Sequence, residues 1–174
     1  MSKRTPISAR QLVRQGDLYG TYRVELNGAS ISVVAAGAGI GFGSVAIADF
    51  PNKQLFIRGV SAQLAWVKQD NNIITTWSGD WAIGTAPNAN TVLTDATDFD
   101  LLGASGGFAI GPAVAGKIAA PATPDRKTTE LVKLWTAAEE VNLNLIVDAA
   151  DITDATTGVV KVFGIVDFLM GMLP

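Results

Sequence analysis

The clearest hydrophobic pattern of the chain lies between residues 141 and 169, in two runs joined by a short acidic connection. The first run alternates apolar and mostly polar residues, and its apolar positions are Val141, Leu143, Leu145 and Val147. In the second run Val160, Val162 and Val166 share one parity, while Phe163, Ile165 and Leu169 make the other parity apolar too. A period of two is typical of β-strands. The pattern therefore predicts a hairpin-like strand pair whose second strand is covered on both faces.

Similar patterns predict further strands upstream, over residues 31–36, 44–50, 55–69, 73–85 and 127–136. The segment 55–69 changes parity near Gly59, which indicates a bulge. Asp70-Asn71-Asn72 is a strong turn signal, so 55–69 and 73–85 are expected to form a long hairpin. Trp77 and Trp81 are four residues apart, hence on one face, and core packing is their expected role.

No helical period is sustained between the strands, which favours an all-β fold: an antiparallel two-sheet β-sandwich. Residues 1–28 are expected to be an extended basic N-terminal arm, and residues 29–174 the sandwich domain. A long loop is predicted over residues 86–126. Within it, short strands are expected at 91–94 and 108–110, and one helical turn at 98–102.

The composition points to a protein that associates with others. Apolar residues make up 48% of the chain and charged residues 17%, against a usual charged share of about 25%. A surface with so few charges exposes apolar patches, which commonly mark interfaces. A homo-oligomer or a part of a larger assembly is therefore favoured over an ordinary monomer rich in alanine and glycine.

Charge is unevenly distributed along the chain. Residues 1–24 hold five basic residues and one acid, whereas the remainder carries 8 basic and 15 acidic residues. Basic arms bind acidic protein surfaces or nucleic acid, and the plain alternative is an unattached terminus. A net charge of −3 argues against nucleic acid as a general partner of the protein.

Catalytic chemistry has little to build on in this sequence. With no cysteine and no histidine, thiol nucleophiles, imidazole bases and a serine triad at Ser78 are excluded. The glycines of residues 37–43 (GAGIGFG) lack the dinucleotide-binding spacing and are expected to form a turn. Asp148, Asp151 and Asp154 could offer oxygens to calcium, but their spacing favours turn formation. No cofactor, metal or small-molecule substrate is predicted, and the chain is expected not to be an enzyme.

Residues 26–48 carry no charge and are long enough to span a bilayer. They contain several glycines and serines and few large aliphatic side chains, so a strand–turn–strand is expected instead. The first twenty residues lack the apolar core of a secretory signal. No membrane association is predicted.

Several segments carry a family resemblance. They are WSGDWAIGTA from Trp77, TVLTDATDFDLL from Thr91, TTELVKLWT from Thr128, VNLNLIVDAAD from Val141 and TGVVKVFG from Thr157. In this order they resemble the jelly-roll capsid decoration (cement) proteins of tailed bacteriophages, over about residues 30–170.

The resemblance implies a jelly-roll sandwich, often a trimer, on the outer capsid surface of a virion, where it bridges neighbouring major capsid protein subunits. Partner contacts are then expected at Lys3, Arg4, Arg10 and Arg14 of the basic arm, and at Phe163, Ile165 and Leu169 of the last strand. The alternative function is a glycan- or receptor-binding β-sandwich of a phage fibre or tail, with Trp77 or Trp81 stacking on sugar rings.

Overall fold

The computed structural model describes residues 7–15, 19–50, 55–90, 93, 101–102, 108–110, 125–135, 139–153 and 156–172. These residues form nine strands: β1 (Ile7–Gln15), β2 (Tyr19–Ala35), β3 (Gly41–Phe50), β4 (Leu55–Lys68), β5 (Trp77–Gly84), β6 (Phe108–Ile110), β7 (Asp125–Trp135), β8 (Glu139–Val147) and β9 (Thr157–Met172). The described part of the chain contains no helix, and so none that could cross a membrane. The all-β prediction is confirmed.

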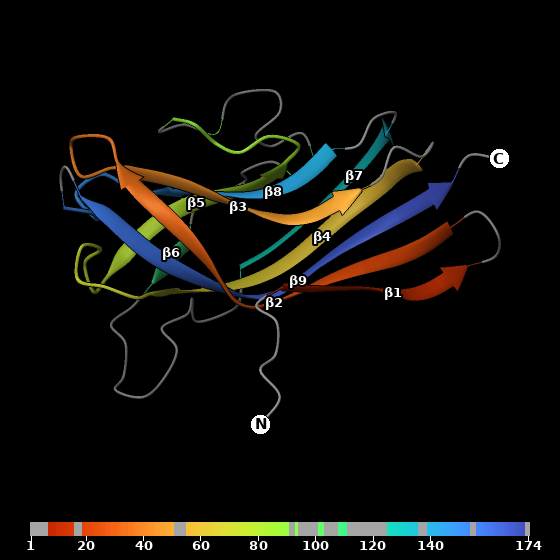
Figure 1. Ribbon diagram of the computed structural model, residues 1–174, viewed down its shortest axis with the longest axis horizontal. Coiled ribbons are helices and arrows are strands. Elements are labelled where there is room, and N and C mark those ends of the chain that lie inside the picture. The colour runs from red at the N-terminus through yellow and green to blue at the C-terminus, as the bar shows by residue number, and fades with distance from the viewer. Residues whose placement is uncertain are drawn as a thin grey trace.

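The strands follow one hydrogen-bonded path in the order β6-β5-β8-β3-β2-β9-β4-β7, with β1 paired to β2, and every pairing is antiparallel. β2 and β3 share only two residue pairs, Val34–Phe42 and Ala35–Gly41. Beyond these pairs the two strands separate (Figure 1). The path thus has two parts, which we call the β9 half (β1, β2, β9, β4, β7) and the β8 half (β3, β8, β5, β6).

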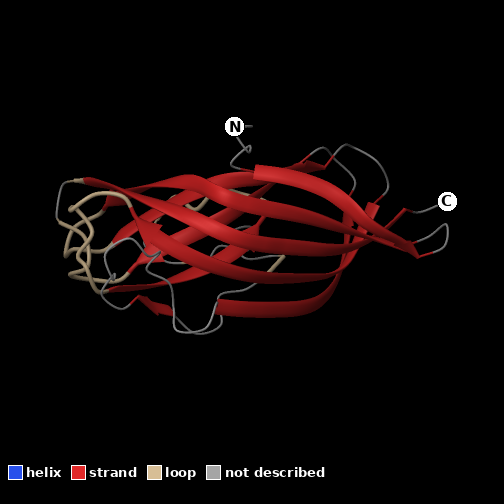
Figure 2. Cartoon of the chain, turned by 90° about the horizontal axis from the view of Figure 1, so that it is seen from below, coloured by secondary structure: helices blue, strands red, loops and turns tan. Residues whose placement is uncertain are grey.

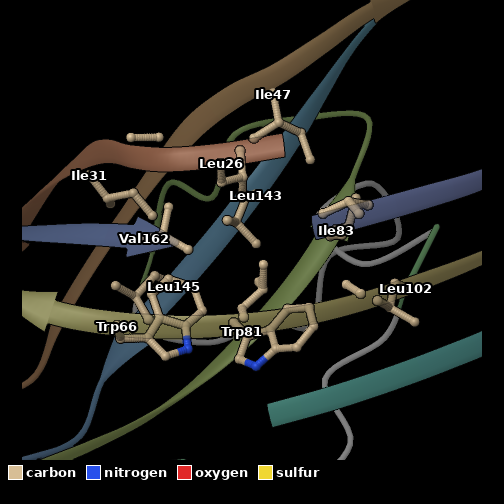
Figure 3. Packing of buried hydrophobic residues seen from close by; sticks show 14 of the residues in the cluster. Leu26, Ile31, Ile47, Trp66, Trp81, Ile83, Leu102, Leu143, Leu145 and Val162 are labelled. Atoms are coloured by element: carbon tan, nitrogen blue, oxygen red, sulfur yellow. The ribbon is translucent and has the colours of Figure 1, made fainter. Parts of the chain in front are cut away.

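Aromatic side chains join the two halves across the core. The ring of Phe50 on β3 lies 5.4 Å from that of Phe168 on β9, and Trp66 on β4 stacks 5.3 Å from Phe108 on β6. Trp66 also lies 6.2 Å from Trp81 on β5 (Figure 3). The two halves therefore pack face to face around one hydrophobic core. The predicted burial of Trp77 and Trp81 is confirmed, since their exposed fractions are 2% and 0%.

Two predicted hairpins are wrong. β4 pairs with β7 and β9, and β5 pairs with β6 and β8, so 55–69 and 73–85 are not hydrogen-bonded neighbours. Likewise β8 pairs with β3 and β5, whereas β9 pairs with β2 and β4. In both cases the connection carries the chain from one half to the other, so consecutive strands lie in opposite layers. A turn signal marks where the chain changes direction, but it does not fix which strand lies alongside.

The strand–turn–strand prediction for residues 26–48 is confirmed. β2 and β3 are joined by residues 36–40, where Ala36 N donates to Ile40 O at 2.9 Å. Gly37 and Gly39 have φ values of +87° and +68°, which glycine adopts without strain. A Cβ at Gly39 would lie 2.6 Å from the backbone of Ala150, so this turn is also closely packed. The predicted bulge at Gly59 appears as a register shift between Ile57 and Gly59.

The N-terminal region belongs to the β9 half from Ile7 onward. β1 pairs with the first part of β2, and β2 runs without a break from Tyr19 to Ala35. The boundary expected after residue 28 therefore falls inside β2. Of the predicted long loop, residues 108–110 form β6 as expected. The short strand expected at 91–94 and most of the helical turn expected at 98–102 lie outside the described residues.

Candidate interaction surfaces

The outer face of the β9 half carries the three apolar residues singled out on β9. Inside the core lie Val160, Val162, Val166 and Phe168, each 0% exposed. Phe163, Ile165 and Leu169 have the opposite parity, so they point away from the core, and all three are only partly buried. The sequence-based assignment of two apolar faces to this strand thus agrees with the structure, while their role in partner binding stays a prediction.

Phe163 is covered in part by its own chain. The register shifts between Asn27 and Ala29 of β2, which leaves Gly28 as an extra residue with a φ of +84°. A Cβ at Gly28 would lie 3.2 Å from the Cζ atom of Phe163. The ring therefore rests over this bulge, and a partner would contact only its remaining surface.

A bidentate ion pair, Arg23–Asp167, lies on the same face, with Asp167 between Ile165 and Leu169 along β9. Arg23 of β2 donates from Nε to Oδ1 and from Nη2 to Oδ2 of Asp167, each at 2.7 Å. The side chains keep exposed fractions of 28% and 21%. The hydrogen bonds to Asp167 raise the pKa of Arg23 above its ordinary value, against a smaller opposing effect of burial. Such paired geometry orients the guanidinium and adds specificity at an interface.

The predicted basic residues separate into three groups. Arg10 of β1 is directly opposite Arg23 of β2, which in turn is opposite Asp167 of β9. Arg14 is opposite Gly20, a position of the other parity. Lys3 and Arg4 lie outside the described residues. The β1–β2 register therefore aligns Arg10 with Arg23 of β2, an alignment that the sequence alone does not show.

The outer face of the β8 half is different, because the chain covers part of it. Asn144, predicted on a polar face, is 0% exposed and Asn142 is 4% exposed. The Asn144 side chain accepts a hydrogen bond from Asn88 N at 2.9 Å and donates one to Ala86 O at 3.0 Å. These two bonds hold residues 86–88 against the outer face of β8. Ala82, which is opposite Asn144 on β5, is also 0% exposed. Among the described residues, the apolar outer face left without such a cover is therefore that of β9.

Three connections gather at one end of the molecule, and we call them the loop end: residues 36–40, 69–76 and 148–153 (Figure 2). Main-chain hydrogen bonds join them. Ile152 N donates to Gly39 O at 3.1 Å, and Thr153 N donates to Asn72 O at 2.8 Å. The large exposed hydrophobic residues near this end are Val34, 47% exposed, and Ile74, 41% exposed.

Two aspartates fix the loop end to the strands. Asp70 accepts a hydrogen bond from Asn72 N at 2.9 Å, which confirms the predicted turn, and another from Val159 N of β9 at 2.7 Å. Asp151 accepts from Ser78 N at 2.7 Å and from Ser78 Oγ at 3.0 Å. The carboxylate of Asp151 is therefore engaged by donors of β5, and no group of possible metal ligands occurs among the described residues.

We expect Asp151→Ala to lower the free energy of unfolding by about 1–3 kcal/mol, because it leaves the partly buried Ser78 donors without an acceptor. Urea denaturation followed by tryptophan fluorescence measures the change. Asp148→Ala is the matched control, since Asp148 bonds here through its backbone: its N donates to Ser78 O at 3.0 Å, and its O accepts from Asp151 N at 3.2 Å. Equal losses in the two variants would contradict the assigned role of the Asp151 carboxylate.

Comparison with known proteins adds a likeness of shape only. No protein-family model and no curated protein matches this sequence. Among solved structures, a chain of infectious bursal disease virus, Gt strain, is 11% identical with a TM-score of 0.39 and matches over 87% of this chain and 32% of its own length. The T=1 particles derived from the bursal virus give 9% identity and the same score of 0.39, over 87% of this chain and 31% of theirs. Desmodium yellow mottle tymovirus gives 12% identity and a TM-score of 0.35, over 100% of this chain and 93% of its own.

This chain spans about a third of the length of the two bursal-virus chains. All three similar structures are those of viruses, and their identities and scores are low. Their properties are therefore not transferred to this protein.

Proposed function

We propose that this protein is a non-enzymatic structural component of a tailed-phage virion, which decorates the outer capsid surface and bridges major capsid protein subunits. The observation that carries the proposal is the difference between its two outer faces. The β8 half covers Asn142 and Asn144 with its own chain, whereas β9 leaves Phe163, Ile165 and Leu169 partly exposed beside an Arg–Asp pair. Aromatic and arginine side chains together are typical of protein–protein contacts.

The strand order supports a jelly roll as the finer description of the fold. Each half contributes four strands in the orders β2-β9-β4-β7 and β3-β8-β5-β6, with β1 added at β2. The connections from β2 to β3, β4 to β5, β6 to β7 and β8 to β9 all pass from one half to the other. Eight strands wound in this way correspond to the two Greek keys of a jelly roll, an architecture common in viral capsid proteins and lectins. It fits the decoration-protein resemblance of the sequence.

Co-sedimentation with undecorated capsids tests the function directly. We expect the purified protein to sediment with capsids that lack it and to stay in solution without them. Absence of binding at micromolar protein concentrations would contradict a decoration role. Trp77 and Trp81 are buried, so they cannot stack on sugar rings as the glycan-binding alternative requires.

We expect Phe163→Asp to weaken self-association and capsid binding by about 2 kcal/mol or more, since it replaces an apolar ring of the proposed contact with a charge. Sedimentation velocity and the capsid assay measure the two effects. Ala46→Asp is the control, because it adds the same charge at an exposed strand position on the β8 half. A Phe163→Asp protein that assembles normally would show that the outer face of β9 is covered within its own chain and is not a contact surface.

A further inference from the structure

One edge of β2 lacks a partner strand in its central part. β9 pairs with β2 from Tyr19 to Val34 along one side. Along the other side, β1 covers β2 as far as Leu26, and β3 pairs only with Val34 and Ala35. Among the described residues no strand lies opposite residues 27–33 on this side. Figure 1 shows β1 beside the first part of β2 and β3 meeting its far end.

One hydrogen bond fixes the direction of the backbone groups of β2. Ala35 N donates at 3.0 Å to Thr156 O, which lies on the β9 side. In an antiparallel ladder the N–H and C=O of one residue point to the same side, and successive residues alternate. Ile31 therefore points its backbone groups at β9, whereas Ser30 points its N–H and C=O at the open edge.

The open part is short and bounded at both ends. Ile7 of β1 is opposite Leu26 at one end. At the other end, a Cβ built at Gly43 of β3 would lie 2.2 Å from Ser32 O, so β3 already passes close to this oxygen. An incoming strand has room for roughly five residues, about the length of a short natural strand.

Natural proteins protect exposed edges with lysine, proline or inward-pointing charges. Residues 27–33 (NGASISV) contain none of these, although the bulge at Gly28 adds some local twist. Their side chains alternate sharply: Ala29, Ile31 and Val33 are at most 1% exposed, while Ser30 and Ser32 are exposed. A matching strand would alternate apolar and uncharged polar residues.

Two segments of this chain that could reach the edge fit it poorly. A second copy's β2 is 17 residues long, and β1 and β3 block both ends of the open part. The residues before β1 include Lys3 and Arg4 in succession. On a strand, neighbouring side chains point to opposite faces, so one of these charges would face the core in either register. Pro6 also lacks the N–H that pairing requires.

We propose that the open edge of β2 around Ser30 accepts a short extended segment of the capsid subunit, with alternating apolar and uncharged polar side chains, as an added strand. The inference rests on the proposed decoration function and names the partner's binding mode. Strand addition supplies affinity through main-chain hydrogen bonds and specificity through the alternate side chains. It would extend the β9 half across the boundary between the two proteins.

Proline at position 30 separates edge pairing from folding. Because the Ser30 N–H points away from β9, Ser30→Pro removes a donor that no described strand accepts from, and proline is tolerated at such edge positions. We expect Ser30→Pro to keep the wild-type melting temperature within a few degrees and to weaken binding to undecorated capsids about tenfold or more. Ser30→Ala keeps the N–H and should bind as the wild type does. Ser30→Lys, which keeps the backbone but blocks the edge with a long charged side chain, should also bind weakly.

Hydrogen exchange tests the edge without capsids. We expect the Ser30 amide to exchange fast in the free protein, the Ile31 amide to exchange slowly, and the Ser30 amide to become protected on capsids. Normal capsid binding by both Ser30→Pro and Ser30→Lys would overturn the proposal while leaving the decoration function intact. Strong protection of Ser30 in the free protein would overturn it as well, because the edge would already be paired. Absence of capsid binding by the wild type would overturn both the decoration function and the capsid segment as the partner of this edge. The exchange rates of the Ser30 and Ile31 amides would still show whether the edge is open.

Discussion

Replacing Trp66 with alanine should lower the free energy of unfolding by about 3–5 kcal/mol, as large-to-small changes of buried aromatic residues do. Trp66 is 0% exposed on β4 and meets two aromatic side chains of the opposite half, Phe108 and Trp81. Its loss opens a cavity where the two halves touch, and backbone pairing cannot close it. Equilibrium denaturation in urea measures the change.

Trp66→Phe is the informative control. The Nε1 atom of Trp66 is buried without a hydrogen-bond partner, so phenylalanine removes volume but no hydrogen bond. We expect a loss of about 1–2 kcal/mol for this variant, and less than about 0.5 kcal/mol for Ile74→Ala at the exposed loop end. A loss below about 1 kcal/mol for Trp66→Ala would mean that the aromatic contacts are not what holds the halves together.

Gly164→Ala should destabilise the protein by about 3 kcal/mol or more, from backbone strain and a steric clash together. Gly164 lies in the middle of β9 with a φ of +137°. A Cβ at this position would lie 2.1 Å from Gln63 O on β4, which belongs to the strand ladder and cannot move alone. The change in thermal and urea-induced unfolding checks the expectation.

Gly37→Ala separates strain from the clash. Gly37 also has a positive φ, +87°, but a Cβ there would meet nothing within 4 Å. We expect a loss of only about 1–2 kcal/mol, the ordinary cost of a left-handed conformation for alanine. Equal effects of the two substitutions would show that β4 and β9 adjust to an added methyl group at Gly164.

The period of two was sufficient to find most strands, because it reports which side chains are buried. It predicted the outward parity of Phe163, Ile165 and Leu169, and the change of parity at Gly59 located a bulge. Which strand lies next to which depends on packing between the two halves, and this leaves no local pattern. For that reason the segments 55–69 and 73–85 look like a hairpin in the sequence, while in the structure Trp66 and Trp81 face each other across the core.

The least predictable features involve polar residues in unexpected places. Asn144 looks like a solvent-facing residue of an alternating strand, yet it binds the backbone of residues 86–88 beneath the surface. The Arg23–Asp167 pair joins a residue of the predicted basic arm to a charged residue within an apolar strand. The available signal for that pair was Asp167, an acid among apolar residues of β9. The sequence does not show that its partner is Arg23.

The pairing of β2 with β9 has a consequence for how the protein is made. Arg23 and Asp167 are 144 residues apart, and every pair of this ladder joins segments that are similarly distant. At about 5–20 residues per second, a ribosome needs on the order of ten seconds or more to make the intervening chain. During that time β2 and β4 have no β9 between them, so the nascent β9 half exposes unpaired edges. Folding of this half is therefore expected to wait until β9 has been made, and the yield of soluble protein should depend on chaperones that shield those edges in the meantime.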